Sequence, residues 1–164
     1  WSSDVCSSDL NAGVFGGDPD RIYLFGRSSG AHLAAAALVT DWSAYGLQGS
    51  PIKGAVLSSG MYDLKPVRLS KRSAYINFTD DMEAALSPQR HAARIDCPVV
   101  VAYGTCETPE FQRQARDFAA VLKAAGKSVR LLVGEGYNHF ELPETLANPY
   151  GLLGRATLEL MRLA

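Results

Sequence analysis

Hydrophobic and polar positions alternate in blocks along this chain. Four short runs of apolar, β-branched or aromatic residues are separated by longer stretches that have a helical period, and they cover residues 22–25, 53–57, 98–103 and 129–133. Continuous apolar runs of this length are typical of strands that are covered on both faces, as in a parallel sheet. We therefore predict an α/β fold with a mostly parallel sheet of about four strands flanked by helices.

Three helices are predicted between and after these strands. Residues 29–40 are apolar nearly all round, which favours a buried helix. In the next helix Thr108 is a candidate cap, Pro109 fits the first turn and Gly126 is a stop signal. A last helix is expected over roughly residues 150–164. The alternation of strands and helices indicates right-handed crossovers.

Two segments do not follow this pattern. Residues 60–87 are polar and irregular with a few aromatic residues, and within them 61–87 is either a lid or substrate-lining insertion or a long surface excursion. We favour the insertion, because long loops in compact domains are often functional. Residues 1–10 nearly repeat Ser-Ser-Asp without a helix or strand period, so we predict an artefactual or disordered tail there and begin the folded domain at residue 11.

Composition narrows the classes of function. A chain of 164 residues with 47% hydrophobic and 20% charged residues suits one globular domain. The formal net charge of -1 gives no reason to expect nucleic acid or an anionic membrane as a partner. No apolar stretch approaches the roughly 20 residues that span a bilayer, and no targeting segment is visible, so the cytoplasm is the default compartment. Three cysteines without a Cys-x-x-Cys pair argue against a disulfide framework and a zinc site.

The candidate nucleophile is Ser28. It lies in Gly26-Arg27-Ser28-Ser29-Gly30, directly after the first predicted strand and before the buried helix. Gly-x-Ser-x-Gly in this context predicts a sharp strand-to-helix turn that holds the serine hydroxyl above the carboxyl edge of the sheet. We expect the glycines on both sides to let the strand and the helix approach without a side-chain clash.

A serine hydroxyl needs a base to take its proton, and the base needs an orienting carboxylate. His139 follows the fourth predicted strand, where a base would reach the carboxyl edge of the sheet. His91 precedes the third strand, so we expect a surface role for it. His32 is four residues after Ser28 on the same helix, and we interpret it as a packing or hydrogen-bonding residue.

The loop after the third strand supplies the candidate acid. Glu107 precedes the helix cap and is the favoured residue, while Glu110 falls in the first helical turn, where the helix dipole alone favours a carboxylate. Asp63 follows the second strand and remains an alternative acid, although a turn-stabilising role fits it better. Cys106 is adjacent to Glu107, but no histidine is placed to activate its thiol.

Several segments together resemble the carboxylesterase and kynurenine-formamidase-like (arylformamidase) branch of the α/β-hydrolases. They are Phe15-Gly-Gly-Asp-Pro-Asp-Arg-Ile22, Gly26-Arg-Ser-Ser-Gly-Ala-His-Leu33, Thr40-Asp-Trp42, Ser87-Pro88, the acid loop Gly104-Thr-Cys-Glu-Thr-Pro-Glu-Phe111 and Gly136-Tyr-Asn-His139-Phe140. The resemblance implies that Ser28 is the nucleophile, Glu107 the acid and His139 the base, with the Ser29 N–H as an oxyanion donor. It implies no metal and no organic cofactor.

The chain departs from this family pattern at its start. The family's other oxyanion donors come from a His-Gly-Gly loop far upstream, and Gly16-Gly17 is too close to the first strand to be that loop, so we interpret it as a turn. We therefore expect residues 11–164 to be the C-terminal part of a catalytic domain. We also expect the 22–25 strand to have an open edge, and these residues alone to be poorly soluble and of low activity.

The favoured function is a serine hydrolase that cleaves small carboxylic esters through a Ser-Glu-His triad and an acyl-enzyme. An arylformamidase acting on N-formylkynurenine-type amides is the alternative with the same chemistry, and fold analogy does not choose between them. A hypothesis of another class is a non-catalytic, hydrolase-like binding module. The predicted partner is a small ester or amide, and the oligomeric state stays open.

Overall fold

A computed structural model describes residues 11–164, so the tail predicted over residues 1–10 lies outside the described residues. The strands are β1 (Ile22–Arg27), β2 (Ile52–Ser58), β3 (Val99–Gly104) and β4 (Val129–Gly134). The α-helices are α2 (Ser29–Val39), α3 (Lys65–Arg68), α4 (Asp80–Leu86), α5 (Pro109–Ala124), α6 (Glu141–Glu144) and α7 (Leu152–Leu160). Short 3₁₀ helices are η1 (Ala12–Phe15), η2 (Pro19–Arg21), η3 (Trp42–Tyr45), η4 (Lys71–Ala74), η5 (Pro88–Arg94) and η6 (Thr145–Ala147).

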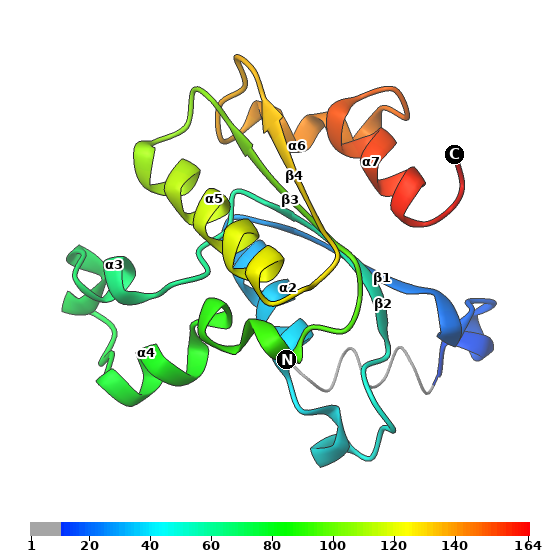
Figure 1. The fold of residues 1–164 in the computed structure, drawn as a ribbon, viewed down its shortest axis with the longest axis horizontal. Coiled ribbons are helices and arrows are strands. Elements are labelled where there is room, and N and C mark those ends of the chain that lie inside the picture. The colour runs from blue at the N-terminus through cyan, green and yellow to red at the C-terminus, as the bar shows by residue number, and fades with distance from the viewer. Residues whose placement is uncertain (1–10) are drawn as a thin grey trace.

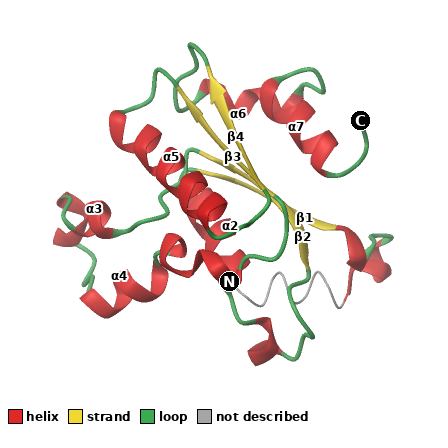
Figure 2. Cartoon of the chain, viewed as in Figure 1, coloured by secondary structure: helices red, strands yellow, loops and turns green. Residues whose placement is uncertain are grey.

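The four strands form one parallel sheet in the order β1-β2-β3-β4, which confirms the predicted fold class. Helices α2 and α5 cover one face of this sheet, and α6 and α7 cover the other (Figure 1). The same three layers, with the strands in the middle, are visible in Figure 2. Because all four strands are parallel, their carboxyl ends lie along one edge of the sheet.

The strands extend one or two residues beyond the apolar runs that predicted them. Their last residues are Arg27, Ser58, Gly104 and Gly134. These positions have no hydrophobic side chain, but their backbone still pairs with the neighbouring strand, which a hydrophobic pattern does not report. The strand ends are therefore polar, and they lead directly into the loops that carry the candidate site.

The helices on the first face begin close to where the sequence predicted them. Helix α2 ends at Val39 rather than residue 40, and its Ala31, Ala35 and Leu38 are buried against the sheet. Thr108 is in the N-cap position of α5, but its side chain accepts no hydrogen bond from the first turn, so the expected side-chain cap is absent there. On the other face α7 ends at Leu160, short of the predicted residue 164.

Residues 60–87 are more ordered than the irregular segment predicted from the sequence, because local caps start short helices within it. Thr79 accepts a hydrogen bond from Met82 N at 3.1 Å and begins α4. The buried Glu83 in α4 then forms ion pairs with Arg68 in α3 and Arg90 in η5. The Arg68 pair joins α3 to α4 within the segment, and the Arg90 pair attaches the segment to the body of the domain, while its role as a lid stays a prediction.

Each outer strand has one neighbour within residues 11–164, so β1 and β4 both present an open edge. Large apolar side chains are partly exposed on these strands, including Phe25 on β1 at 40% and Leu131 on β4 at 38%. The open edge of β1 agrees with the expectation from the sequence. Of the described helices, none combines the length and apolar character that crossing a bilayer requires.

We expect Phe118→Ala to lower the free energy of unfolding by about 3–5 kcal/mol. Phe118 is fully buried on α5 and stacks on Tyr62, with ring centroids 4.2 Å apart. Its truncation therefore leaves a cavity between the helix and the sheet. The measurement is urea unfolding of the purified protein. Tyr150→Ala is the control, because Tyr150 is 91% exposed and its loss should change stability by less than about 0.5 kcal/mol; similar losses for both variants would contradict the packing described.

Candidate active site

The turn between β1 and α2 holds Ser28 in a strained backbone conformation, with φ 55° and ψ -119°. Its N–H donates to Ser58 O at 2.9 Å, and its carbonyl accepts from the N–H groups of Ala31 and His32 at 3.1 Å each. These bonds hold the residue between the end of β2 and the first turn of α2. As a whole, Ser28 is half-buried, so the turn is not closed off from solvent.

The two glycines of the motif are not equivalent. A Cβ on Gly26 would lie 2.4 Å from Gly30 O and 2.6 Å from Ala31 Cα, so only glycine lets β1 and α2 approach this closely. A Cβ on Gly30 would meet nothing within 4 Å. The expectation that both glycines prevent a clash was wrong for Gly30, because its Cα faces open space rather than the strand.

The carboxylate of Glu107 is buried at the end of β3 and is held by two donors. Its Oε1 accepts from Ser59 Oγ at 2.5 Å and from Gly104 N at 3.1 Å. The Gln112 amide on α5 donates to the carbonyls of Thr105 and Glu107 and so holds the acid loop against the helix. Because the side chain is fully buried, water does not compete with these donors, and they fix the orientation of the carboxylate.

The free oxygen of this carboxylate faces His139, whose Nδ1 lies 3.4 Å from Glu107 Oε2. The loop that carries His139 is bound to the acid loop at two points: Cys106 N donates to Tyr137 O at 3.0 Å, and Gly136 N donates to Thr105 Oγ1 at 2.8 Å. The imidazole also packs on the Phe111 ring, with centroids 4.4 Å apart. The structure therefore brings the candidate acid and the candidate base together.

The candidate nucleophile is on the same edge of the sheet but is not bonded to the base. Within the described residues, no hydrogen bond joins Ser28 Oγ to His139. Catalytic hydrogen bonds are often long without substrate and shorten only in the complex. The neighbours of the two residues do meet, because the Arg27 guanidinium lies over the Phe140 ring, 4.9 Å from its centroid.

The other histidines form contacts away from this edge. The Nε2 of His32 is 2.8 Å from Leu86 O, and that of His91 is 2.9 Å from Ala84 O. Both imidazoles therefore bind α4 to the rest of the domain. For His32 this is the hydrogen-bonding role that the sequence predicted. In both residues the ring nitrogen is thus bonded to a carbonyl of α4 and not to the Ser28 hydroxyl.

The alternative acids are also engaged elsewhere. Glu110 is paired with Arg113, whose hydrogen bond lowers the pKa of the Glu110 carboxyl below its usual range. Asp63 Oδ1 accepts from Lys65 N at 3.2 Å, which is the turn-stabilising role expected for it. Gly16 has φ 76° and ends η1, so Gly16-Gly17 is the turn that the sequence predicted.

Three further residues at this site, Ser59, Phe111 and Arg27, were not predicted from the sequence to contribute to it. Ser59 is fully buried with φ 54°, and it follows β2 in the same way that Ser28 follows β1. The available signal for Ser59 was its position, since it is a second serine that follows a strand and precedes a glycine. That position does not identify the partner of its hydroxyl. Only the packed structure shows that its partner is Glu107.

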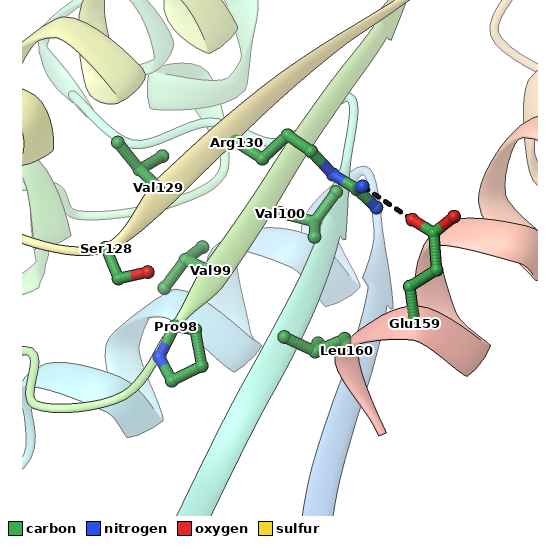
Figure 3. Close-up of a pocket in the computed structure, with 8 residues that line it drawn as sticks. All are labelled: Pro98, Val99, Val100, Ser128, Val129, Arg130, Glu159 and Leu160. Carbon is green, nitrogen blue, oxygen red and sulfur yellow. Dashed lines mark hydrogen bonds and ion pairs between the residues drawn. The ribbon is translucent and has the colours of Figure 1, made fainter. Parts of the chain in front are cut away.

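One hollow on the sheet lies away from this site. A cavity of about 220 Å³ lies where β3 and β4 begin, beside the Arg130–Glu159 ion pair (Figure 3). That position is at the opposite end of the strands from Ser28 and Glu107. The cavity therefore gives no information about a substrate of the candidate site.

A family profile described as "Carboxylesterase family" matches residues 9–95, which is more than half of the chain. The match includes the strand, turn and helix around Ser28. This chain belongs to the carboxylesterase family.

Individual relatives agree with this family. The chain is 33% identical over 145 residues to the kynurenine formamidase of Danio rerio, a match that covers 85% of this chain and 49% of the relative. It is 29% identical over 163 residues to the isoprenylcysteine alpha-carbonyl methylesterase of Arabidopsis thaliana, covering 85% of this chain and 37% of that protein. This carboxylesterase-family chain thus spans about half the length, or less, of these curated relatives.

Solved structures show the same fold. The thermophilic esterase Est2 of Thermogutta terrifontis superposes with a TM-score of 0.69 at 24% identity, covering 98% of this chain and 60% of that one. At this identity the likeness concerns the fold alone. It supports the parallel sheet and its helical layers as an α/β-hydrolase arrangement.

We expect Cys106 in this carboxylesterase-family chain to react with iodoacetamide at pH 8 at least about tenfold faster than Cys97. Cys106 is exposed on the acid loop, whereas desolvation by burial raises the pKa of the Cys97 thiol to about 11 and leaves little thiolate. Peptide mass spectrometry after timed alkylation measures both rates. In denaturant the two rates should become similar; equal rates in the native protein would contradict the burial of Cys97.

Proposed function

We propose that this chain carries the catalytic centre of a serine hydrolase that cleaves carboxylic esters through an acyl-enzyme. Ser28 is the nucleophile, His139 the general base and Glu107 the acid that orients the base. The observation that supports this proposal is the buried Glu107, whose free oxygen faces His139 Nδ1 at 3.4 Å on the sheet edge where the strained Ser28 turn lies. A nucleophile, a base and an oriented carboxylate on one edge are what acyl transfer to water requires.

The reaction follows from these groups. His139 Nε2 takes the proton of the Ser28 hydroxyl as the oxygen attacks the ester carbonyl, and the buried Glu107 carboxylate stabilises the imidazolium that forms. The tetrahedral intermediate collapses, and His139 returns the proton to the departing alcohol. Water, deprotonated by His139, then attacks the acyl-enzyme and releases the carboxylic acid and the free serine.

The developing oxyanion is stabilised by the N–H of Ser29. Ser29 is the first residue of α2, and the first N–H groups of a helix have no acceptor within the helix. They also lie at the positive end of the helix dipole. The resemblance implies further donors from an upstream loop, so the activity belongs to the full-length protein, and the low activity expected of these residues alone stays a prediction.

An arylformamidase is the second candidate, and the similarity to the Danio rerio kynurenine formamidase favours it. The chemistry is the same up to the leaving group, which is then an aryl amine instead of an alcohol. Phe111 packs on His139 with its ring tilted, and Tyr137 and Phe140 lie in the same loop as His139 with exposed rings, so aromatic surface suited to an aryl leaving group is close to the base. The ratio of kcat/KM for N-formylkynurenine to that for p-nitrophenyl acetate separates the two candidates.

We expect a fluorophosphonate probe to label Ser28 in the full-length protein and Ser28→Ala to abolish the labelling. His139→Ala should lower esterase turnover by at least about 10⁴-fold, because the hydroxyl loses its base. His91→Ala is the matched control, since His91 contacts Ala84 O away from the site. Circular dichroism checks that each variant folds. Absence of labelling in the wild-type protein would favour the non-catalytic binding module.

We expect Ser59→Gly to lower kcat about tenfold with a smaller change in KM, because Glu107 loses its hydroxyl donor and holds His139 less firmly. Glycine is the informative replacement, since it tolerates the φ of 54° that would strain alanine. Ser58→Ala is the control: Ser58 is equally buried, but among residues 11–164 its hydroxyl has a hydrogen bond only with Ser59 Oγ, at 3.4 Å, and none with Glu107. Equal kcat for Ser59→Gly and wild type would show that the hydroxyl has no role in positioning the acid.

A further inference from the structure

Four side chains lie in contact, one after the next, across the segments that carry the three candidate catalytic residues. Phe111 from α5 packs on His139 at 4.4 Å between ring centroids, His139 meets Phe140 edge-on at 5.7 Å, and the Arg27 guanidinium lies over Phe140 at 4.9 Å. Phe111 follows the acid loop, and Arg27 immediately precedes Ser28. This row of side chains therefore connects the acid, base and nucleophile segments through the faces of the His139 ring, without involving the Glu107 carboxylate or the Ser28 hydroxyl.

Arg27 is placed for this contact by the turn that strains Ser28. Gly26 faces α2, with no room for a Cβ, so the next side chain along the strand points to the opposite face of the sheet. That is the face covered by α6 and α7, and Phe140 is the residue at the start of α6. The direction of the Arg27 side chain is thus a consequence of the close approach of β1 and α2.

Arg27 has no partner other than the ring in the part of the chain that the structure describes. Its Nε is buried without a hydrogen-bond partner, and no carboxylate of residues 11–164 pairs with it. A buried guanidinium nitrogen without a partner is unfavourable, but the attraction of a cation to an aromatic face grows when the cation is desolvated. The arginine stem also packs against the ring as apolar surface.

We propose that Arg27 is a positioning residue: by binding the Phe140 ring it holds the His139 loop against the nucleophile turn. The inference rests on the proposed function, in which His139 must reach Ser28. The acid loop already holds the other side of the His139 loop through Cys106 N–Tyr137 O and Gly136 N–Thr105 Oγ1. Those bonds orient His139 toward Glu107, and the Arg27–Phe140 contact is what connects the same loop to the Ser28 segment.

The test compares Arg27→Met, Phe140→Leu and the double variant in the full-length protein. Two quantities are measured: the rate at which a fluorophosphonate labels Ser28, and hydrogen–deuterium exchange of the amides of residues 135–141. We expect each single variant to slow labelling about tenfold and to speed exchange of the loop. The double variant should be no slower than either single variant, because both remove the same contact.

Two matched controls accompany these variants. Phe140→Tyr keeps an aromatic ring at a position that is 71% exposed, and it should label at close to the wild-type rate. Arg130→Met removes an arginine from the same face of the sheet, but at the Glu159 ion pair shown in Figure 3, and it should change neither quantity. If Arg27→Met alters folding, Phe140→Leu still tests the contact, since Phe140 lies at the surface.

The outcomes separate this proposal from the proposed function. If Arg27→Met has the same labelling rate and the same loop exchange rate as Arg130→Met, the positioning role is overturned. Slower labelling with unchanged exchange would also overturn it, since Arg27 would then act on Ser28 without holding the loop. If the wild-type protein is not labelled at all, the hydrolase proposal fails, and the exchange comparison still decides whether Arg27 holds the loop.

Discussion

The parallel hydrogen bonding of four strands is the constraint on which the rest of this structure depends. Since every strand runs in the same direction, the loops that follow β1, β2, β3 and β4 all leave from one edge of the sheet. Ser28, Ser59, Glu107 and His139 follow these four strands in turn, one on each loop. Residues separated by as many as about a hundred positions along the chain are brought to one edge by backbone pairing, before any of their side chains interact.

Burial then determines what these polar groups do. The Glu107 carboxylate is fully buried, and a buried carboxylate is costly unless donors surround it. Ser59 Oγ and Gly104 N supply donors to one oxygen, which leaves the other oxygen facing His139. The strain at Ser28 and Ser59, both with positive φ, is sustained by buried surroundings on the sheet and in α2. The arrangement of the site is thus maintained by the packing beneath it.

The contacts around the site extend beyond the residues that the chemistry needs. Phe111 and Phe140 pack against His139, and Arg27 lies over Phe140. Gln112 holds the acid loop against α5, and Thr105 attaches that loop to the His139 loop. The segment over residues 60–87 is attached separately, with α4 bound by the Glu83–Arg90 ion pair and by the imidazoles of His32 and His91. Its exposed middle, over residues 71–77, distinguishes it from the loops of the site, which are bonded to one another directly.

The sequence by itself determined the fold class, because alternating apolar runs and helical periods report local burial, and burial on both faces is what distinguishes a parallel sheet. It also identified the Ser28 turn, since a Gly-x-Ser-x-Gly motif between a strand and a helix is a local signal. The tertiary structure alone decided that Ser59 bonds to Glu107, that Gly26 but not Gly30 is required for close approach, and that Arg27 lies on Phe140. These are contacts between distant segments or across packed faces, and the hydrophobic pattern of a chain records whether a side chain is buried but not which side chain it meets.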